Sequence, residues 1–281
     1  MNTCYFALYL LIHSLSAAVD ILHINADAVH TWLSQNWLSL NPKKSEAIQF
    51  TSGRGQGRVE DIASIAVSGV RIKPSTVVKS LGVTLDGGLT FDQHIANVCK
   101  ASYFHIRALR HVRKSLPDDV AKTVACSIVG SRIDYCNALL VGMSDSNFAK
   151  LQRVQNTLAR VVLGLRKFEH ITPALIELHW LPVKQRVTFK LATLTMKTIH
   201  SGQPTYLRDL VNAYEPVRTL RSSSQHLLCV GRTRTVTAAR SFRHSSATIW
   251  NSLPAEIRDC TAVDNFKRKL KTHLFKLAFA A

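Results

Sequence analysis

The chain has 281 residues, 46% of them hydrophobic, so it is long enough to bury a core and to hold one or two domains. Its formal net charge is +18: residues 1–100 carry 8 Lys and Arg against 7 Asp and Glu, whereas residues 101–281 carry 28 against 11. A positive field of this size attracts polyanions, with nucleic acid as the first candidate and an anionic membrane surface as the second. The charge alone leaves that choice open.

The cysteines and acidic residues do not form the patterns of a metal or catalytic site. No CxxC pair occurs, no Cys and His residues have the spacing of a zinc site, and the 18 acidic residues show no HExxH-type motif. We therefore expect no metal, no cofactor and no small-molecule substrate, and we favour an intracellular location (nucleus or cytoplasm) over secretion. We interpret the cysteines as reduced, buried thiols. They are Cys4, Cys99, Cys126, Cys136, Cys229 and Cys260.

The first fifty residues predict a helix and a short strand. The apolar run "YFALYLLIHSLSAA" is too short to span a membrane and lacks the positive start of a signal peptide, so we interpret it as the entry to a core element. Apolar residues keep helical spacing from Ala18 to Leu38, with Trp32 and Trp37 among them, which predicts a face packed on a sheet or helix. Asn41 and Pro42 end this helix, and "EAIQF" predicts a strand.

The texture of the chain changes near His94. Residues 65–91 are rich in Val and Ile and are broken by Gly and Pro, which indicates hairpins. After His94, apolar residues recur with helical spacing in three segments. The second of these has Val120, Val124 and Ile128 on its expected apolar face, which continues to Tyr135 and Leu139. The predicted fold class is α+β, mainly α.

Basic residues form stripes on two of the three predicted helices. The first stripe consists of Lys100, Arg107, Arg110 and Lys114, and the second of Lys150, Arg153 and Arg160. Two such stripes on neighbouring helices are typical of a groove that holds a nucleic-acid backbone. A solvated face that keeps the protein soluble is the alternative, and it stays open.

The rest of the chain is also predicted to be helical. Pro173, Pro182 and Pro204 suit first helical turns, and Gly202 suits a helix end. We interpret His170, His179 and Trp180 as a packed corner rather than a site. The last segment, "VDNFKRKLKTHLFKLAF", is amphipathic; its lysines suit a membrane surface, but we expect Phe266 and Leu270 to close the core.

Six strings in unbroken order resemble one known family. They are "WLSQNWLSLNPKKSEAIQF", "VKSLGVTLDGGLTFDQHI", "SRIDYCNALLVG", "LQRVQNTLARVV", "LHWLPVKQRVTFK" and "IWNSLPAEIR". Together they are similar to the C-terminal part of reverse transcriptases from non-LTR (LINE-type, jockey-like) retrotransposons, over residues 18–281. The resemblance implies a palm remnant at residues 1–92, a helical thumb at residues 93–168 and a basic C-terminal extension at residues 169–281.

The resemblance also implies roles for single residues. "LNPKKSE" looks like the palm's fourth motif, which would put Lys43 or Lys44 near the phosphates of an incoming nucleotide, with an exposed turn as the alternative. "SLGVTLD" is similar to the hairpin that grips the primer end, with Leu81, Gly82 and Val83 at its core. The basic stripes would then belong to the thumb and hold the primer–template duplex.

The sequence departs from the family at the catalytic carboxylates. Polymerisation needs carboxylates that hold two Mg²⁺ ions, and the family supplies them from a palm aspartate and a Tyr/Phe-Ala-Asp-Asp turn. Here Tyr5, Phe6 and Ala7 are followed by Leu8, and Asp20 and Asp27 lie on the wrong element. We therefore expect a truncated reverse transcriptase-like protein that is not an enzyme and at most binds the RNA or DNA backbone without sequence preference. The alternative is a basic structural or membrane-surface-associated protein without catalytic activity.

Overall fold

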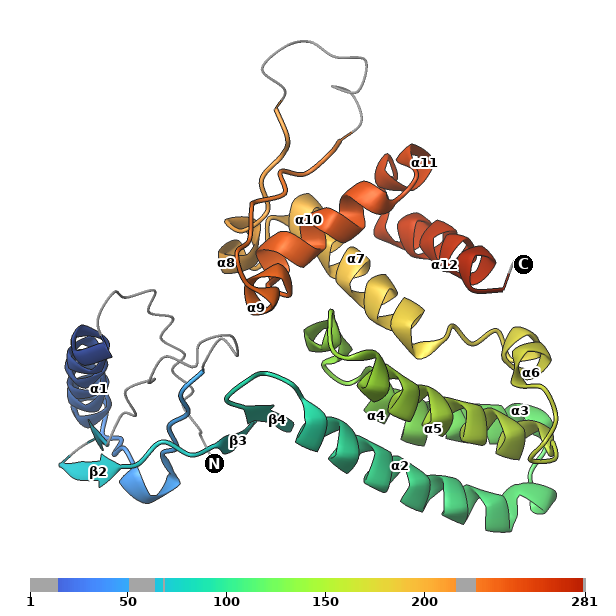
Figure 1. Ribbon diagram of the computed structural model, residues 1–281, viewed down its shortest axis with the longest axis horizontal. Helices are drawn as coiled ribbons and strands as arrows, with labels where there is room; N and C mark the ends of the chain where they lie inside the picture. Colours follow the sequence, from blue (N-terminus) through green and yellow to red (C-terminus); the bar gives the residue numbers. More distant parts are fainter. Residues whose placement is uncertain (1–14, 51–63, 68, 216–225, 280–281) are drawn as a thin grey trace. The chain divides into compact units, whose positions relative to one another are not determined.

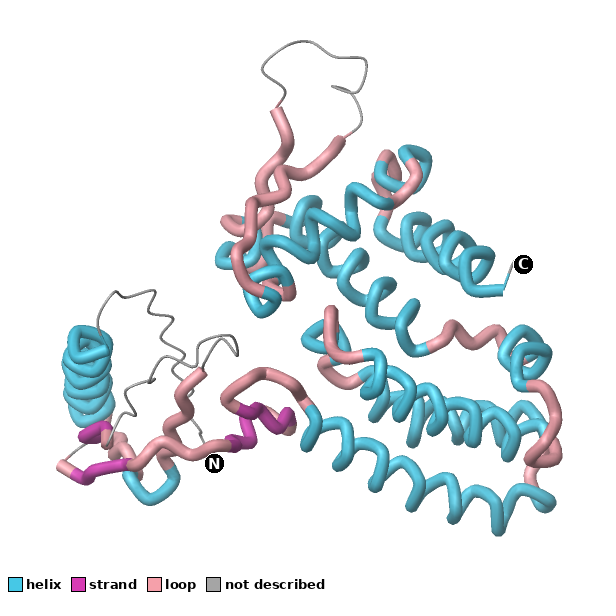
Figure 2. The backbone as a smooth tube through the Cα atoms, in the orientation of Figure 1, coloured by secondary structure: helices cyan, strands magenta, loops and turns pink. Residues whose placement is uncertain are grey.

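The computed structural model describes residues 15–50, 64–67, 69–215 and 226–279 of the chain. The chain divides into two compact units, Met1–His94 and Ile95–Ala281. Among the described residues, the short antiparallel strands all lie in the first unit, and helices make up most of the second, as Figures 1 and 2 show. The predicted class, α+β and mainly α, is confirmed at this level.

The first unit contains one long helix and two small hairpins. Helix α1 (Leu15–Gln35) is followed by a 3-10 turn, η1 (Pro42–Lys44). Strands β1 (Ile65–Val67) and β2 (Val70–Ile72) form one hairpin, and β3 (Val77–Ser80) and β4 (Val83–Asp86) form the other. The Ala66 N–H donates to His23 Nε2 over 3.0 Å, which ties β1 to α1.

Two expectations for the first unit are corrected. "EAIQF" forms only an isolated parallel bridge between Ile48 and Ser75, because no strand in the described part of the chain continues the ladder on either side. The expected apolar face of α1 is only partly covered, since Ile21, Leu22 and Val29 are half-buried. Leu33 is buried, but Trp32 in the last turn of the helix is 58% exposed. Trp37, two residues beyond the helix, is 98% exposed. The three-residue strands of the first hairpin are too short to cover a 21-residue helix.

The second hairpin is fixed by polar contacts from its own sequence. The turn between β3 and β4 places Leu81 at φ 47° and Gly82 at φ 82°, the left-handed pair that a tight hairpin turn requires. After β4, the Asp86 carboxylate accepts the backbone N–H groups of Thr90 and Phe91 over 2.8 and 2.7 Å. The loop that leads into the next helix is therefore held by the aspartate of "SLGVTLD".

The second unit begins with a group of packed helices. Helix α2 (Asp92–Val112) continues into η2 (Arg113–Ser115). The next three elements follow one another without a break and form one helical segment: α3 (Asp118–Ala125), a π turn η3 (Cys126–Gly130) and α4 (Ser131–Asp134). After η4 (Asn137–Leu140), helix α5 (Asp145–Leu163) starts at Ser144, whose hydroxyl accepts the Asn147 N–H, and ends at Gly164 with φ 68°. Leu151, Val154 and Leu158 of α5 lie in the core.

The predicted face of the second helical segment is wrong. Val120, Ile128, Tyr135 and Leu139 are exposed, and Val124 is only half-buried. The buried residues are Ala121, Ala125, Val129 and Ile133, spaced four apart. A regular helix would rotate such a series off the core, but the π turn widens one turn of the helix and keeps all four on one side.

The remaining helices are α6 (Ile171–Glu177), α7 (Val183–Ser201), α8 (Thr205–Arg208), α9 (Val236–Ala239), α10 (Phe242–Ser252), α11 (Ala255–Arg258) and α12 (Val263–Phe279). Of these, α8, α10 and α12 pack on α7, while α6 packs on α5, α9 on α10 and α11 on α12. Figure 1 shows α10 and α12 lying against α7. Phe266 and Leu270 of α12 are completely buried there, as predicted, and Phe266 stacks on Trp250 with ring centroids 5.7 Å apart. Pro182 and Pro204 precede helices and Gly202 ends one, also as predicted.

Candidate nucleic-acid interface

The solvent side of α2 is basic beyond its first turn, and the only acidic residue of the helix is Asp92 at its start. Lys100, Arg107, Arg110 and Lys114 are all exposed. No Asp or Glu occurs anywhere from Gln93 to Pro117. Within the described residues, none of the four forms an ion pair or a side-chain hydrogen bond. Their charges are therefore not neutralised within this part of the protein.

The opposite side of α2 fixes this orientation. Ile95, Ser102, Ile106 and Leu109 are buried, with exposed fractions of 6% or less. At the end of the helix, Arg113 donates from Nε to the Val162 carbonyl of α5 over 2.7 Å. The guanidinium of Arg113 also pairs with Asp118. Because α2 is anchored by its apolar side and by Arg113, its basic side stays turned to solvent.

The three basic residues of α5 are placed differently from one another. Arg153 is exposed, and its Nε donates to the Ala149 carbonyl within its own helix; Lys150 is half-buried, and its Nζ lies 2.9 Å from Asn147 Oδ1. Arg160 is half-buried and donates to the Glu169 carbonyl over 3.1 Å. Arg160 therefore holds the chain that follows α5, whereas Lys150 and Arg153 keep their charges near the surface.

The two basic stripes adjoin at Cys99 on α2. Burial raises the pKa of the Cys99 thiol, and the positive charges of Lys150 and Arg153 oppose that rise. Lys150 and Arg153 of α5 are thus near enough to affect Cys99 of α2, the residue that precedes Lys100 in the sequence. We call the six residues Lys100, Arg107, Arg110, Lys114, Lys150 and Arg153 the α2–α5 basic surface.

Two aromatic residues of this surface were not among the sequence candidates. Tyr103 is 38% exposed and Phe104 is 67% exposed. Phe104 follows Lys100 by four residues and precedes Arg107 by three, so the three side chains are neighbours on the helix surface. That helical spacing was visible in the sequence.

The candidate residues of the first unit are exposed in part. Lys43 and Lys44 are exposed in η1, where the Asn41 side chain accepts the Lys43 N–H over 3.1 Å. Leu81 is 64% exposed at the tip of the second hairpin, next to Gly82 in the turn. Val83 is buried, so its side chain supports the hairpin from inside.

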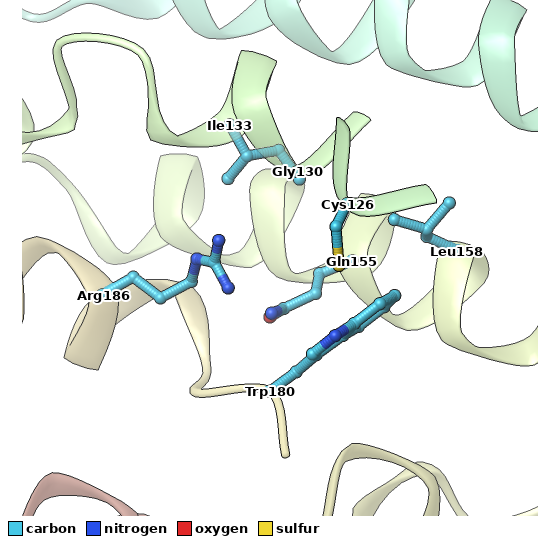
Figure 3. A pocket seen from close by; sticks show the side chains of 7 residues that line it. All are labelled: Cys126, Gly130, Ile133, Gln155, Leu158, Trp180 and Arg186. Carbon is cyan, nitrogen blue, oxygen red and sulfur yellow. The ribbon is translucent and has the colours of Figure 1, made fainter. Parts of the chain in front are cut away.

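One small pocket in the second unit lies between the η3–α4 segment, α5 and the start of α7. Figure 3 shows Cys126, Gln155 and Trp180 gathered on one side of it and Arg186 on the other. Its cavity volume is about 20 Å³, room for one water molecule. Gln155 donates to the Leu181 carbonyl over 2.8 Å, and Arg186 forms a two-pronged ion pair with Asp134. The polar groups here hold elements together and leave no room for a substrate.

The cysteine and histidine expectations are partly corrected. The five described cysteines are free thiols, but only Cys260 is buried; Cys99 and Cys136 are half-buried, and Cys126 and Cys229 are exposed. Cys4 lies outside the described residues. Trp180 is buried as expected, whereas His179 is exposed with its ring 6.0 Å from Phe275. Within the described ranges, no three His, Cys, Asp or Glu residues are grouped so as to hold a metal ion.

The described helices offer no membrane-spanning segment, since none is both long and apolar enough. The amphipathic helix α12 also uses its apolar side within the protein, because Phe266, Leu270 and Leu274 are buried in the core around α7. Most of the apolar face that an interfacial helix would insert into lipid is thus already covered, although Leu277 near the end of α12 is 66% exposed.

Comparison with known proteins finds no match for this chain. No family model matches it, and neither the curated proteins nor the solved structures contain a match.

Proposed function

We propose that the protein binds the sugar–phosphate backbone of RNA or DNA, without sequence preference, through the α2–α5 basic surface. One observation carries this proposal: a helix exposes four cations over a 25-residue stretch that contains no carboxylate. Lysine and arginine side chains gain affinity for nucleic acid by releasing the counterions of phosphates. A surface of this kind contacts the backbone and reads no bases.

Other basic helices of the same unit argue against a merely solvated face. On α12, Lys267 pairs with Asp264 over 3.1 Å, and on α7, Lys184 approaches Asp145 at 3.6 Å. A surface that serves solubility mixes both charge signs in this way. On α2 the one carboxylate, Asp92, lies in the first turn, and within the described residues Arg107, Arg110 and Lys114 form no ion pair, although like charges on adjacent turns repel one another. A polyanionic partner would remove that cost.

We further propose, from the resemblance in the sequence, that the chain derives from a non-LTR reverse transcriptase. The first unit would correspond to a palm remnant, and α2 to α5 would correspond to a thumb that holds the nucleic-acid backbone. Leu81 supports a contact role for the second hairpin, because its apolar side chain is 64% exposed at the hairpin tip. The chain contains no Tyr/Phe-Ala-Asp-Asp turn, so we assign it no polymerase activity.

The proposal is tested by measuring binding over a salt series. Fluorescence anisotropy with labelled RNA, single-stranded DNA and duplex DNA of about 20 nucleotides should give affinities that fall steeply between about 50 and 200 mM salt. Co-sedimentation with phosphatidylserine-containing vesicles is run beside it. Binding to vesicles without binding to any oligonucleotide would refute the proposal and favour the membrane-surface alternative.

A further inference from the structure

Phe104 occupies an unusual position on the α2–α5 basic surface. Its side chain is 67% exposed, with Lys100 one turn before it and Arg107 one turn after it. The ring packs edge-on against His105, with centroids 5.3 Å apart, and its outer part faces solvent. A single exposed apolar residue is common on protein surfaces, so the position between two unpaired cations is the informative feature.

We propose that Phe104 stacks on an unpaired base while Lys100 and Arg107 hold the phosphates on either side, so that the surface prefers single-stranded RNA or DNA. This inference rests on the proposed function and names its substrate class. Proteins that bind single strands combine a basic track with aromatic rings on which bases stack. Stacking is tolerant of sequence because every base offers a π face.

The setting of the ring favours a single strand over a duplex. Phe104 lies on a helix whose other side is buried through Ile106 and Leu109, so the ring is presented by a rigid support. In a duplex the bases are stacked on one another, and a side chain fixed on a helix has no free base face to reach. In a single strand the bases can turn outward onto the ring while the phosphates stay on the cations.

The charges of Lys100 and Arg107, together with the Phe104 ring, favour a nucleic-acid ligand over a protein partner. A protein partner would have to supply carboxylates to Lys100 and Arg107 and an apolar pocket to Phe104, whereas each nucleotide supplies a negative charge and a flat apolar face together. Tyr103, 38% exposed on the same side of the helix, offers a second ring for a neighbouring base. A single nucleic-acid strand can match both the cations and the exposed rings of this surface.

The test separates stacking from phosphate binding. Affinities are measured for a single strand, for an abasic strand with the same number of phosphates, and for a duplex. The variants are Phe104→Leu, which keeps an apolar helix-forming side chain but removes the ring, and Tyr206→Leu, which removes an equally exposed ring on α8. Circular dichroism checks the fold of each.

We expect the unaltered protein to bind the single strand about 5- to 100-fold more tightly than the abasic strand, the range for a stacked base. Phe104→Leu should remove most of that difference and leave the abasic affinity unchanged, and Tyr206→Leu should change neither. Equal affinity for single and abasic strands, or a Phe104→Leu protein that keeps the difference, would overturn the inference while leaving backbone binding intact. No binding to any of the three would instead refute the proposed function itself.

Discussion

Several polar side chains from the six sequence strings quoted above form hydrogen bonds or ion pairs between segments of the second unit. Asp134 of "SRIDYCNALLVG" pairs with Arg186 of "LHWLPVKQRVTFK", and Gln152 of "LQRVQNTLARVV" accepts the Val183 N–H at the start of α7 over 2.9 Å. Asn251 of "IWNSLPAEIR" both accepts from and donates to the backbone of Leu228 over 2.8 Å. These residues join segments that are distant in sequence, so the strings contribute to the packing of this unit.

The Asp134–Arg186 pair gives a prediction with an internal control. Arg186→Gln should lower the free energy of unfolding by about 1 to 3 kcal/mol, because Asp134 loses a two-pronged partner in a partly buried place. Lys184→Gln, on the same helix, should cost at most about 0.5 kcal/mol, since its 3.6 Å contact to Asp145 is well exposed. Urea unfolding followed by the helical signal measures both. If both variants had the same free energy of unfolding, the Asp134–Arg186 pair would contribute no more to stability than an exposed ion pair.

His94 predicts a pH dependence for the junction between β4 and α2. Burial lowers the pKa of His94, and its Nδ1 accepts the Thr84 N–H over 3.4 Å, so the neutral ring fits the folded state. Above the usual histidine pKa of about 6.5, the ring is neutral in both states. As the pH falls below that value, the unfolded chain takes up a proton that the folded chain resists, so stability decreases.

The measurement compares unfolding at about pH 7.5 and about pH 5.5. His94→Asn, whose amide oxygen can accept the same N–H, should lose less stability on acidification than the unaltered protein. His111→Asn serves as the control because His111 is exposed on the same helix, and it should behave like the unaltered protein. If His94→Asn lost stability to the same extent as the control, the acid sensitivity would have another origin.

At the scale of elements, the helix borders and the strand-to-helix switch could be predicted, but some faces could not. Ser144, Pro182 and Gly202 act locally, so their roles at helix ends follow from sequence. The π turn at Cys126–Gly130 has no local signal, and it alone decides that Ala125 rather than Ile128 is buried. The exposure of Trp32 and Trp37 likewise depends on which element covers α1, which periodicity cannot reveal.

Two substitutions can show whether the π turn sets which face of this helical segment is buried. Ala125→Leu adds three carbon atoms where nothing is exposed, against α5, and should lower the free energy of unfolding by about 1 to 3 kcal/mol. Ile128→Ala should cost less than about 1 kcal/mol, because Ile128 is 41% exposed. A regular helix with Val120, Val124 and Ile128 inward would reverse this order. Thermal unfolding of both variants distinguishes the two arrangements.

At the scale of the whole molecule, the sequence alone shows the uneven charge. It predicts only some of the residues that form the α2–α5 basic surface. Lys100, Arg107, Arg110 and Lys114 are exposed as their spacing predicted. Arg160 shares the spacing of its stripe but binds the Glu169 carbonyl, and Phe104 joins the surface although no charge pattern marks it. Charge periodicity locates a basic face, whereas side-chain partners depend on tertiary contacts such as these.

The catalytic expectation gives a prediction for the whole chain. The purified protein should extend no primer on an RNA or DNA template with Mg²⁺ or Mn²⁺, because the chain has no Tyr/Phe-Ala-Asp-Asp turn to hold two metal ions at a 3′-hydroxyl and a triphosphate. A primer-extension assay with a mock purification as its blank measures this. Template-dependent incorporation above the blank would contradict the expectation.

The most direct test of the account is the salt dependence of nucleic-acid binding after charge removal from α2. Lys100→Gln, Arg107→Gln and Arg110→Gln together remove three cations of the α2–α5 basic surface. Arg268→Gln, Lys271→Gln and Lys276→Gln together remove the same charge from the exposed side of α12. Both proteins are checked for helical content and then titrated with duplex DNA between about 50 and 300 mM salt.

Each lost phosphate contact flattens the slope of log affinity against log salt by about 0.9. The α2 variant should therefore lose about 2 to 3 from that slope, and the α12 variant should keep the slope of the unaltered protein. Equal slopes in the two folded variants would contradict the account, because the α2–α5 basic surface would then contribute no more than any other basic face of the protein.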